Sequence, residues 1–99
     1  MTTGKYKVTL VLPAWTVENE LELIPEDNGV LKGTLNTMNG DAENSVVSFS
    51  KGFWNKDFFQ ISLTVGPGKL ELVGKVEHET ITGVVIIDHT PDSLTGIRI

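Results

Sequence analysis

KLELVGKVEHETITGVVII, residues 69–87, is the stretch that decides the fold predicted for this chain. Apolar and polar residues alternate on both sides of residues 77–79, which predicts two β-strands folded back on each other. Each predicted strand carries a glycine in the middle of its apolar face, Gly74 in the first and Gly83 in the second. The same alternation recurs along the rest of the chain, so this hairpin predicts the architecture of the whole.

The composition predicts one globular domain covering residues 1–99. Hydrophobic residues make up 39% of the 99 residues, which is a globular composition with enough chain for one core. There is no cysteine, so neither a disulfide nor a thiolate metal site can hold the fold. The two histidines, His78 and His89, cannot form a zinc site alone.

The charge pattern argues against nucleic acid and membrane partners. The formal net charge is −5, and the eight Lys and Arg residues are scattered, so a phosphate backbone would be repelled. No apolar run approaches the roughly eighteen residues of a membrane span, and the N-terminus shows no signal-peptide pattern. We therefore expect a cytoplasmic protein.

Six further strands are predicted outside the opening hairpin, each followed by a turn signal. Pro and Gly mark most of these turns, and Asn-Gly pairs mark two of them. In the fourth strand Val47 and Phe49 are expected to point inward, but the adjacent Val46 leaves the register of residues 43–58 open. The predicted strands are 5–12, 17–24, 30–36, 43–50, from 53 or 57 to 65, and 93–99, with turns at 25–29, 37–41, 51–52, 66–68 and 88–92.

These strands predict an all-β fold, because no stretch of ten or more residues shows helical periodicity. Short connections make sequential strands antiparallel neighbours in an up-and-down meander. Closing the meander removes both exposed edges, so we predict a closed or nearly closed eight-stranded antiparallel up-and-down barrel rather than a sandwich.

The chain also resembles itself. Residues 6–10 parallel residues 59–63, and two further pairs of segments, 20–23 with 69–72 and 31–35 with 81–85, follow in the same order. This order predicts an internal duplication of two four-stranded halves.

Four glycines, each two places after an apolar residue, fall on the predicted inner face. An inward glycine fills no space, so we expect these positions to allow strong coiling where the sheet closes. The alternative is that they open room for a ligand. The four are Gly33, Gly74, Gly83 and Gly96.

An up-and-down topology sends alternate loops to opposite ends of the barrel. One end, the mouth, collects Trp15, Met38 and His89 among Pro and Gly residues. These side chains are candidates for contact with an apolar ligand or a partner protein. Alternatively, Trp15 folds over the core as a lid.

The other end holds both termini and is expected to be closed. Because the first and last strands would pair there, Arg98 can lie over Tyr6 or Trp54 as a cation–π pair worth about 0.5–2 kcal/mol. The alternative is that Arg98 extends into solvent at the C-terminus.

The closing end carries a resemblance to known proteins. Gly4-Lys5-Tyr6 on the first strand, with Arg98 on the last, resembles the G-x-W and Arg signature of the calycins, which include lipocalins, fatty-acid-binding proteins and avidins; here Tyr6 replaces the Trp. The chain is also similar to small bacterial all-β modules that occur alone or appended to flavin-dependent oxidoreductases. The segments that carry this second resemblance are residues 31–34, 37–40, 90–92 and 95–99. The resemblance implies a barrel and no particular reaction.

No specific biochemical activity can be deduced from the sequence. Asp88 and His89 would point to opposite faces of a strand, and no phosphate loop or nucleophile elbow occurs, so we expect no catalytic residues, no metal and no cofactor. Large inward side chains should nearly fill a barrel of eight strands. We therefore expect a non-catalytic accessory or interaction domain with a filled core, pairing with itself or with an enzyme. The alternative is a barrel that binds a small apolar ligand at the mouth.

Overall fold

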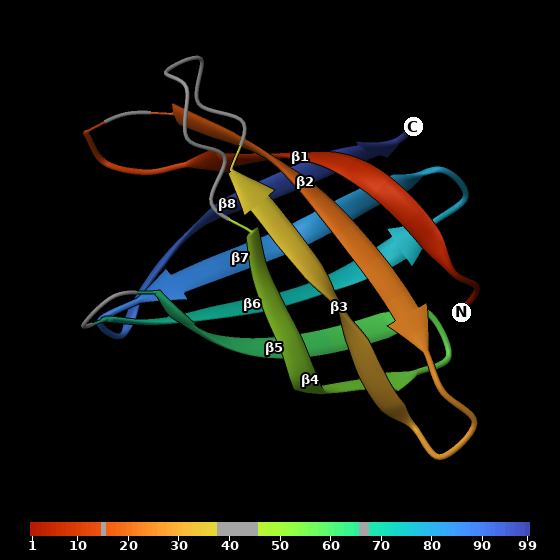
Figure 1. Ribbon diagram of the computed structural model, residues 1–99. Coiled ribbons are helices and arrows are strands. Elements are labelled where there is room, and N and C mark those ends of the chain that lie inside the picture. The colour runs from red at the N-terminus through yellow and green to blue at the C-terminus, as the bar shows by residue number, and fades with distance from the viewer. Residues whose placement is uncertain (15, 38–45, 66–67) are drawn as a thin grey trace.

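The computed structural model describes residues 1–14, 16–37, 46–65 and 68–99, and the described residues form an antiparallel β-barrel (Figure 1). Each strand pairs with its neighbours in chain order, and the order closes on itself. This confirms the predicted all-β up-and-down barrel. None of the described residues belongs to a helix that is long and apolar enough to cross a membrane. The strands are β1 Gly4–Val11, β2 Thr16–Pro25, β3 Val30–Thr37, β4 Val46–Asn55, β5 Phe58–Val65, β6 Gly68–Glu77, β7 Thr80–Ile87 and β8 Thr90–Arg98.

The first and last strands close the barrel, as predicted. In the β1–β8 register Tyr6 lies opposite Arg98 and Leu10 opposite Leu94. Both termini therefore lie at one end of the barrel, with the β2–β3, β4–β5 and β6–β7 turns (Figure 1). The β7–β8 turn lies at the opposite end, the mouth.

The barrel interior is built from the alternating apolar positions of all eight strands. Its side chains are mainly aliphatic, with three aromatic rings among them, and they form one continuous cluster. Hydrophobic burial of this kind is the main stabilising contribution in a domain of this size. The fully buried or nearly buried residues are Tyr6, Val8, Leu10, Leu21, Leu23, Leu31, Leu35, Phe49, Phe59, Ile61, Leu63, Leu72, Ile81, Val85 and Leu94.

The turn predicted at residues 51–52 is wrong. β4 continues to Asn55, and the chain reverses at Lys56-Asp57, where Lys56 takes a positive φ of 56°. Gly52 is instead a buried strand residue, and a Cβ there would lie 2.9 Å from the Leu31 carbonyl oxygen. Glycine at this position thus serves the close approach of β3 and not a turn. The inward placement of Phe49 is confirmed; it is buried, and its neighbour Val47 on the same face is half-buried.

The last connection is shorter than predicted. Asp88 and His89 form a two-residue turn with φ values of 49° and 66°, and β8 begins at Thr90 instead of residue 93. Pro91 lies opposite Ile86 of β7, whereas the register with β1 starts only at Ser93. Proline is tolerated here because, among the described residues, this part of β8 pairs with β7 alone, so no second strand requires a backbone N–H from residue 91.

The inward glycines let strands and rings approach closely. A Cβ at Gly33 would collide with the Glu22 carbonyl oxygen, and one at Gly83 would collide with that of Val73. A Cβ at Gly74 would lie 2.9 Å from the Phe59 ring. The space beside these glycines is thus occupied by the chain itself, which supports tight coiling of the sheet over room for a ligand.

The β4–β5 interface is less complete than the others. Its register covers Phe53↔Gln60, Trp54↔Phe59 and Asn55↔Phe58, next to the turn. Farther from the turn, β4 bends and runs away from β5 (Figure 1). The barrel is thus closed between these strands only near the turn.

Candidate functional site

The predicted mouth site is only partly described. Trp15 and Met38 lie outside the described residues, and His89 is exposed in the β7–β8 turn. A hollow of about 400 Å³ lies at this end, between the β1–β2 connection and the β7–β8 turn. Its lining combines the apolar residues Leu12, Pro13, Ala14 and Ile87 with the polar residues Asp88, Thr90 and Asp92. The described part of the mouth therefore offers a shallow apolar surface beside two carboxylates.

Asn19 is a buried polar residue toward the mouth end of the interior. It lies on the inner face of β2, opposite Val8 of β1, and only 3% of its surface is exposed. Its Nδ2 atom has no hydrogen-bond partner among the described residues. A buried amide donor without a partner costs about 1–3 kcal/mol. In the sequence this site corresponds to an asparagine in the alternating series that continues with Leu21 and Leu23, whose side chains point inward.

At the opposite end, Tyr6 and Arg98 meet beside Gly4. Tyr6 is buried, while the Arg98 side chain is exposed and its Nη2 donates to the Thr3 carbonyl oxygen at 3.4 Å. The Arg98 guanidinium carbon and the Tyr6 hydroxyl both lie 3.4 Å from the Cβ position of Gly4. The register thus brings the two predicted closing residues together, and their cation–π stacking stays a prediction.

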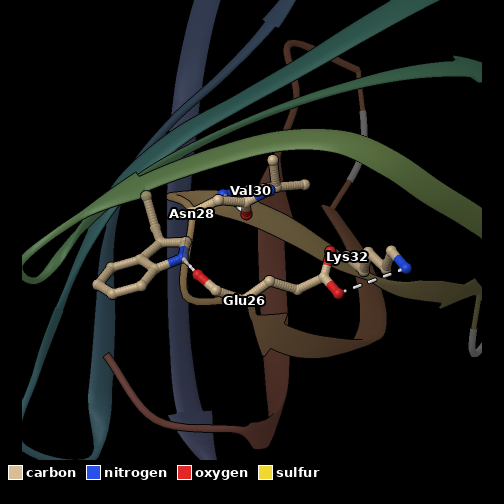
Figure 2. A network of polar contacts seen from close by, with 5 residues as sticks. Glu26, Asn28, Val30 and Lys32 are labelled. Atoms are coloured by element: carbon tan, nitrogen blue, oxygen red, sulfur yellow. Dashed lines mark hydrogen bonds and ion pairs between the residues drawn. The ribbon is translucent and has the colours of Figure 1, made fainter.

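Trp54, the third predicted closing residue, is fixed to the β2–β3 turn. Its indole Nε1 donates to the Glu26 carbonyl oxygen at 2.9 Å, and its backbone N–H donates to Gly29 at the same distance. Figure 2 shows the surrounding network, in which the Glu26 carboxylate pairs with Lys32 at 3.5 Å. Asn28 caps the same turn by accepting from the Val30 N–H. Trp54 therefore joins the turn to β4 at the closed end.

An aromatic groove lies on the outer wall beside Trp54. The side chains of Phe53 and Phe58 are 61% and 59% exposed, which is unusual for phenylalanine. The Lys75 Nζ lies 5.7 Å from the centre of the Phe58 ring, within the range of a cation–π contact. The groove has a volume of about 270 Å³ and is lined by Phe53, Trp54, Asn55, Phe58, Phe59, Gln60 and Val73.

Three lysines lie near the groove residues, by contact or in the chain, although the protein is acidic. Lys51 and Lys56 flank Phe53 and Phe58 in the chain, and both lysines are exposed. Neither forms an ion pair within the part of the chain that the structure describes, whereas Lys75 pairs with Glu77 at 3.7 Å. The side chain of Asp57, in the turn between β4 and β5, is the carboxylate next to Lys56 in the chain. The groove thus combines exposed rings with two lysines, Lys51 and Lys56, that form no ion pair among the described residues.

The described residues bring no cluster of metal-ligating groups together. No group of three or more His, Asp or Glu residues suited to a metal occurs among residues 1–14, 16–37, 46–65 and 68–99. Asp88 and His89 are both exposed in a tight turn. The aromatic groove was not predicted, because the sequence left the register of β4 undecided. The feature of the sequence that corresponds to the groove is the pair of phenylalanines, Phe53 and Phe58, at outward strand positions.

A scan against protein-family models finds no match for this chain, and a search of the curated proteins finds none either. Functional inference therefore rests on the geometry of the barrel.

Proposed function

We propose that this protein is a non-catalytic interaction barrel of the calycin type that binds a partner protein at the aromatic groove. The exposure of Phe53 and Phe58 on the outer wall carries the proposal. Aromatic side chains dominate the energetics of protein interfaces, and a grooved apolar patch on a small barrel is typical of a contact surface. The closely packed interior supports binding on the outside of the barrel.

The charges around the groove define the partner. Lys75 lies over the Phe58 ring, and the exposed Lys51 and Lys56 lie close to Phe53 and Phe58 in the chain, in a protein whose net charge is −5. A partner segment with an apolar or aromatic anchor flanked by carboxylates would match both the rings and the lysines. Such a segment could belong to an enzyme, and the setting we propose is cytoplasmic, in keeping with a chain without cysteine.

Selection from a displayed random peptide library on the full chain tests this proposal. We expect the enriched peptides to combine aromatic or aliphatic residues with Asp and Glu. The double substitution Phe53→Ser and Phe58→Ser should weaken their binding at least tenfold, since hot-spot aromatics contribute about 2 kcal/mol or more each. Dissociation constants measured by fluorescence anisotropy give the comparison.

The matched control is Ile97→Ser, because Ile97 is 65% exposed on β8, away from the groove. This variant should bind the selected peptides as the unsubstituted chain does. Equal losses in both variants, or peptides that bind without regard to the phenylalanines, would overturn the proposal.

A second candidate function is binding of a small apolar molecule at the mouth. The hollow of about 400 Å³ beside Leu12 and Ile87 favours it, and the unpaired amide of Asn19 is a separate observation, because Asn19 is buried on the inner face of β2 and does not line the hollow. A ligand with an apolar body would fit the hollow, and a hydrogen-bond acceptor on this ligand would have to reach into the barrel to meet Asn19. Trp15, Met38 and His89 stay the predicted contacts from the loops.

A hydrophobic fluorescent dye with a carbonyl acceptor tests the mouth. If the mouth binds apolar molecules, the dye should gain intensity with the full chain, and Ile87→Asp should reduce its affinity at least tenfold by placing a charge in the hollow. Thr80→Asp, at the opposite end of the same strand, is the control. A dye signal that is absent, or equal in the two variants, would count against a mouth site.

A further inference from the structure

The two strands beside the aromatic groove each have an edge without a partner strand. Of the strands described, β4 pairs with β5 only at residues 53–55, and residues 46–52 pair with β3 on one side alone. Residues 61–65 of β5 likewise pair with β6 alone. We call residues 46–52 and 61–65 the open seam. In Figure 1 the two strands diverge from their turn toward the mouth.

Backbone groups in the open seam lack the ladder that every other interface of the barrel supplies. Every second N–H and C=O of a strand points to each side, so each edge presents unpaired donors and acceptors. The side chains behave differently, because Phe49, Ile61 and Leu63 are all buried. The core is thus covered at the seam, while these strand edges have no ladder partner among the described residues.

We propose that the open seam accepts an extended segment of the partner protein as an added strand along β5. This inference rests on the proposed function and specifies how the same partner binds. The free edge of β5 leads directly from Leu63 to Gln60, which lies opposite Phe53 in the groove. A strand laid on that edge would therefore bring its end to the exposed rings. Main-chain hydrogen bonds would supply affinity and the groove would supply specificity.

The outward side chains of the seam select the chemistry of the segment. Ser48, Ser62 and Thr64 are exposed and uncharged, and Lys51 is the exposed cation among the seam residues. The added strand should alternate, with polar residues outward and small or β-branched residues inward. A carboxylate near its groove end would face Lys51. This composition excludes a segment rich in lysine and arginine.

Backbone methylation of the bound peptide tests strand addition without altering the protein. The probe is the tightest acidic-aromatic peptide from the library selection, made with N-methyl groups at alternate residues. One methylated set should bind at least tenfold more weakly, because it removes the N–H groups that face β5, while the other set should bind nearly unchanged. If both sets bind as the parent peptide does, or both lose affinity equally, strand addition is overturned, while the groove proposal stands or falls by the phenylalanine variants.

Hydrogen exchange locates the added strand independently. On peptide binding, amides of residues 61–65 should gain protection, and those of residues 16–25 in β2 should not. Protection confined to the mouth or to the groove would contradict strand addition. Protection of residues 61–65 that grows with protein concentration, without peptide, would replace the partner segment with a second copy of this chain.

Discussion

Replacing Gly83 by alanine is expected to lower the free energy of unfolding by about 3 kcal/mol or more, near the upper end of overpacking effects. The added Cβ would collide with the Val73 carbonyl oxygen and would press on the Cα of Gly74. Both are backbone atoms of β6, paired through the β6–β7 register, so no side-chain rotation can relieve the contact. The two strands would have to separate at this point of the barrel wall.

Urea unfolding and thermal melting both measure this loss. For a domain of this size 1 kcal/mol corresponds to a shift of about 4–8 °C in Tm, so a drop of more than about 12 °C is expected. Gly4→Ala is the control, because the nearest atoms to its Cβ are side-chain atoms of Tyr6 and Arg98 at 3.3–3.4 Å. That substitution should cost less than about 1 kcal/mol. A Gly83→Ala protein as stable as Gly4→Ala would mean that Gly83 lies beside free space, as a role in ligand binding requires.

Strand alternation made the architecture of the barrel predictable. A period of two places side chains on one face, so Leu21 and Leu23 in β2 were readable as core residues. Short connections then left few alternatives to antiparallel neighbours, and the pairing of Tyr6 with Arg98 followed from closure. Local pattern and chain connectivity were sufficient because this fold has no long crossover.

The path of β4 could not be predicted because its signals are ambiguous over a short range. Lys51-Gly52 reads as a turn, but Gly52 is a glycine for a different reason, the close approach of Leu31. Four residues beyond Gly52, Lys56-Asp57 carries the actual turn without a glycine, since Lys56 itself takes the positive φ. Lysine rarely adopts a positive φ, so the sequence gives no reason to expect a turn at Lys56.

The candidate binding surface depended on that same path. Whether Phe53 points inward or outward changes with a shift of one residue in the register. The open seam is still less visible from the sequence, because it arises from the divergence of β4 and β5, a long-range property of the closed barrel. Asn19 shares the alternation of Leu21 and Leu23, but its lack of a hydrogen-bond partner among the described residues is evident only in three dimensions.

Replacing Asn19 by leucine is expected to raise the free energy of unfolding by about 1–3 kcal/mol, which is the cost of the unpaired buried amide. Leucine branches at the same atom as asparagine, and the surrounding positions Leu21 and Val8 are apolar and buried. Chemical denaturation should show a higher midpoint with an unchanged slope. Asn55→Leu is the control, since Asn55 is exposed at the end of β4 and should give no comparable gain.

The same pair of variants decides why the chain keeps a costly amide inside its barrel. If Asn19 holds a ligand at the mouth, Asn19→Leu should be more stable and should also lose affinity for the acceptor-bearing dye, because stability and binding compete at such a position. If the barrel acts only through its outer wall, the gain in stability should come with unchanged binding of the selected peptides. A variant that is less stable than the original would show instead that the amide has a partner in solution, and the mouth would lose its strongest support.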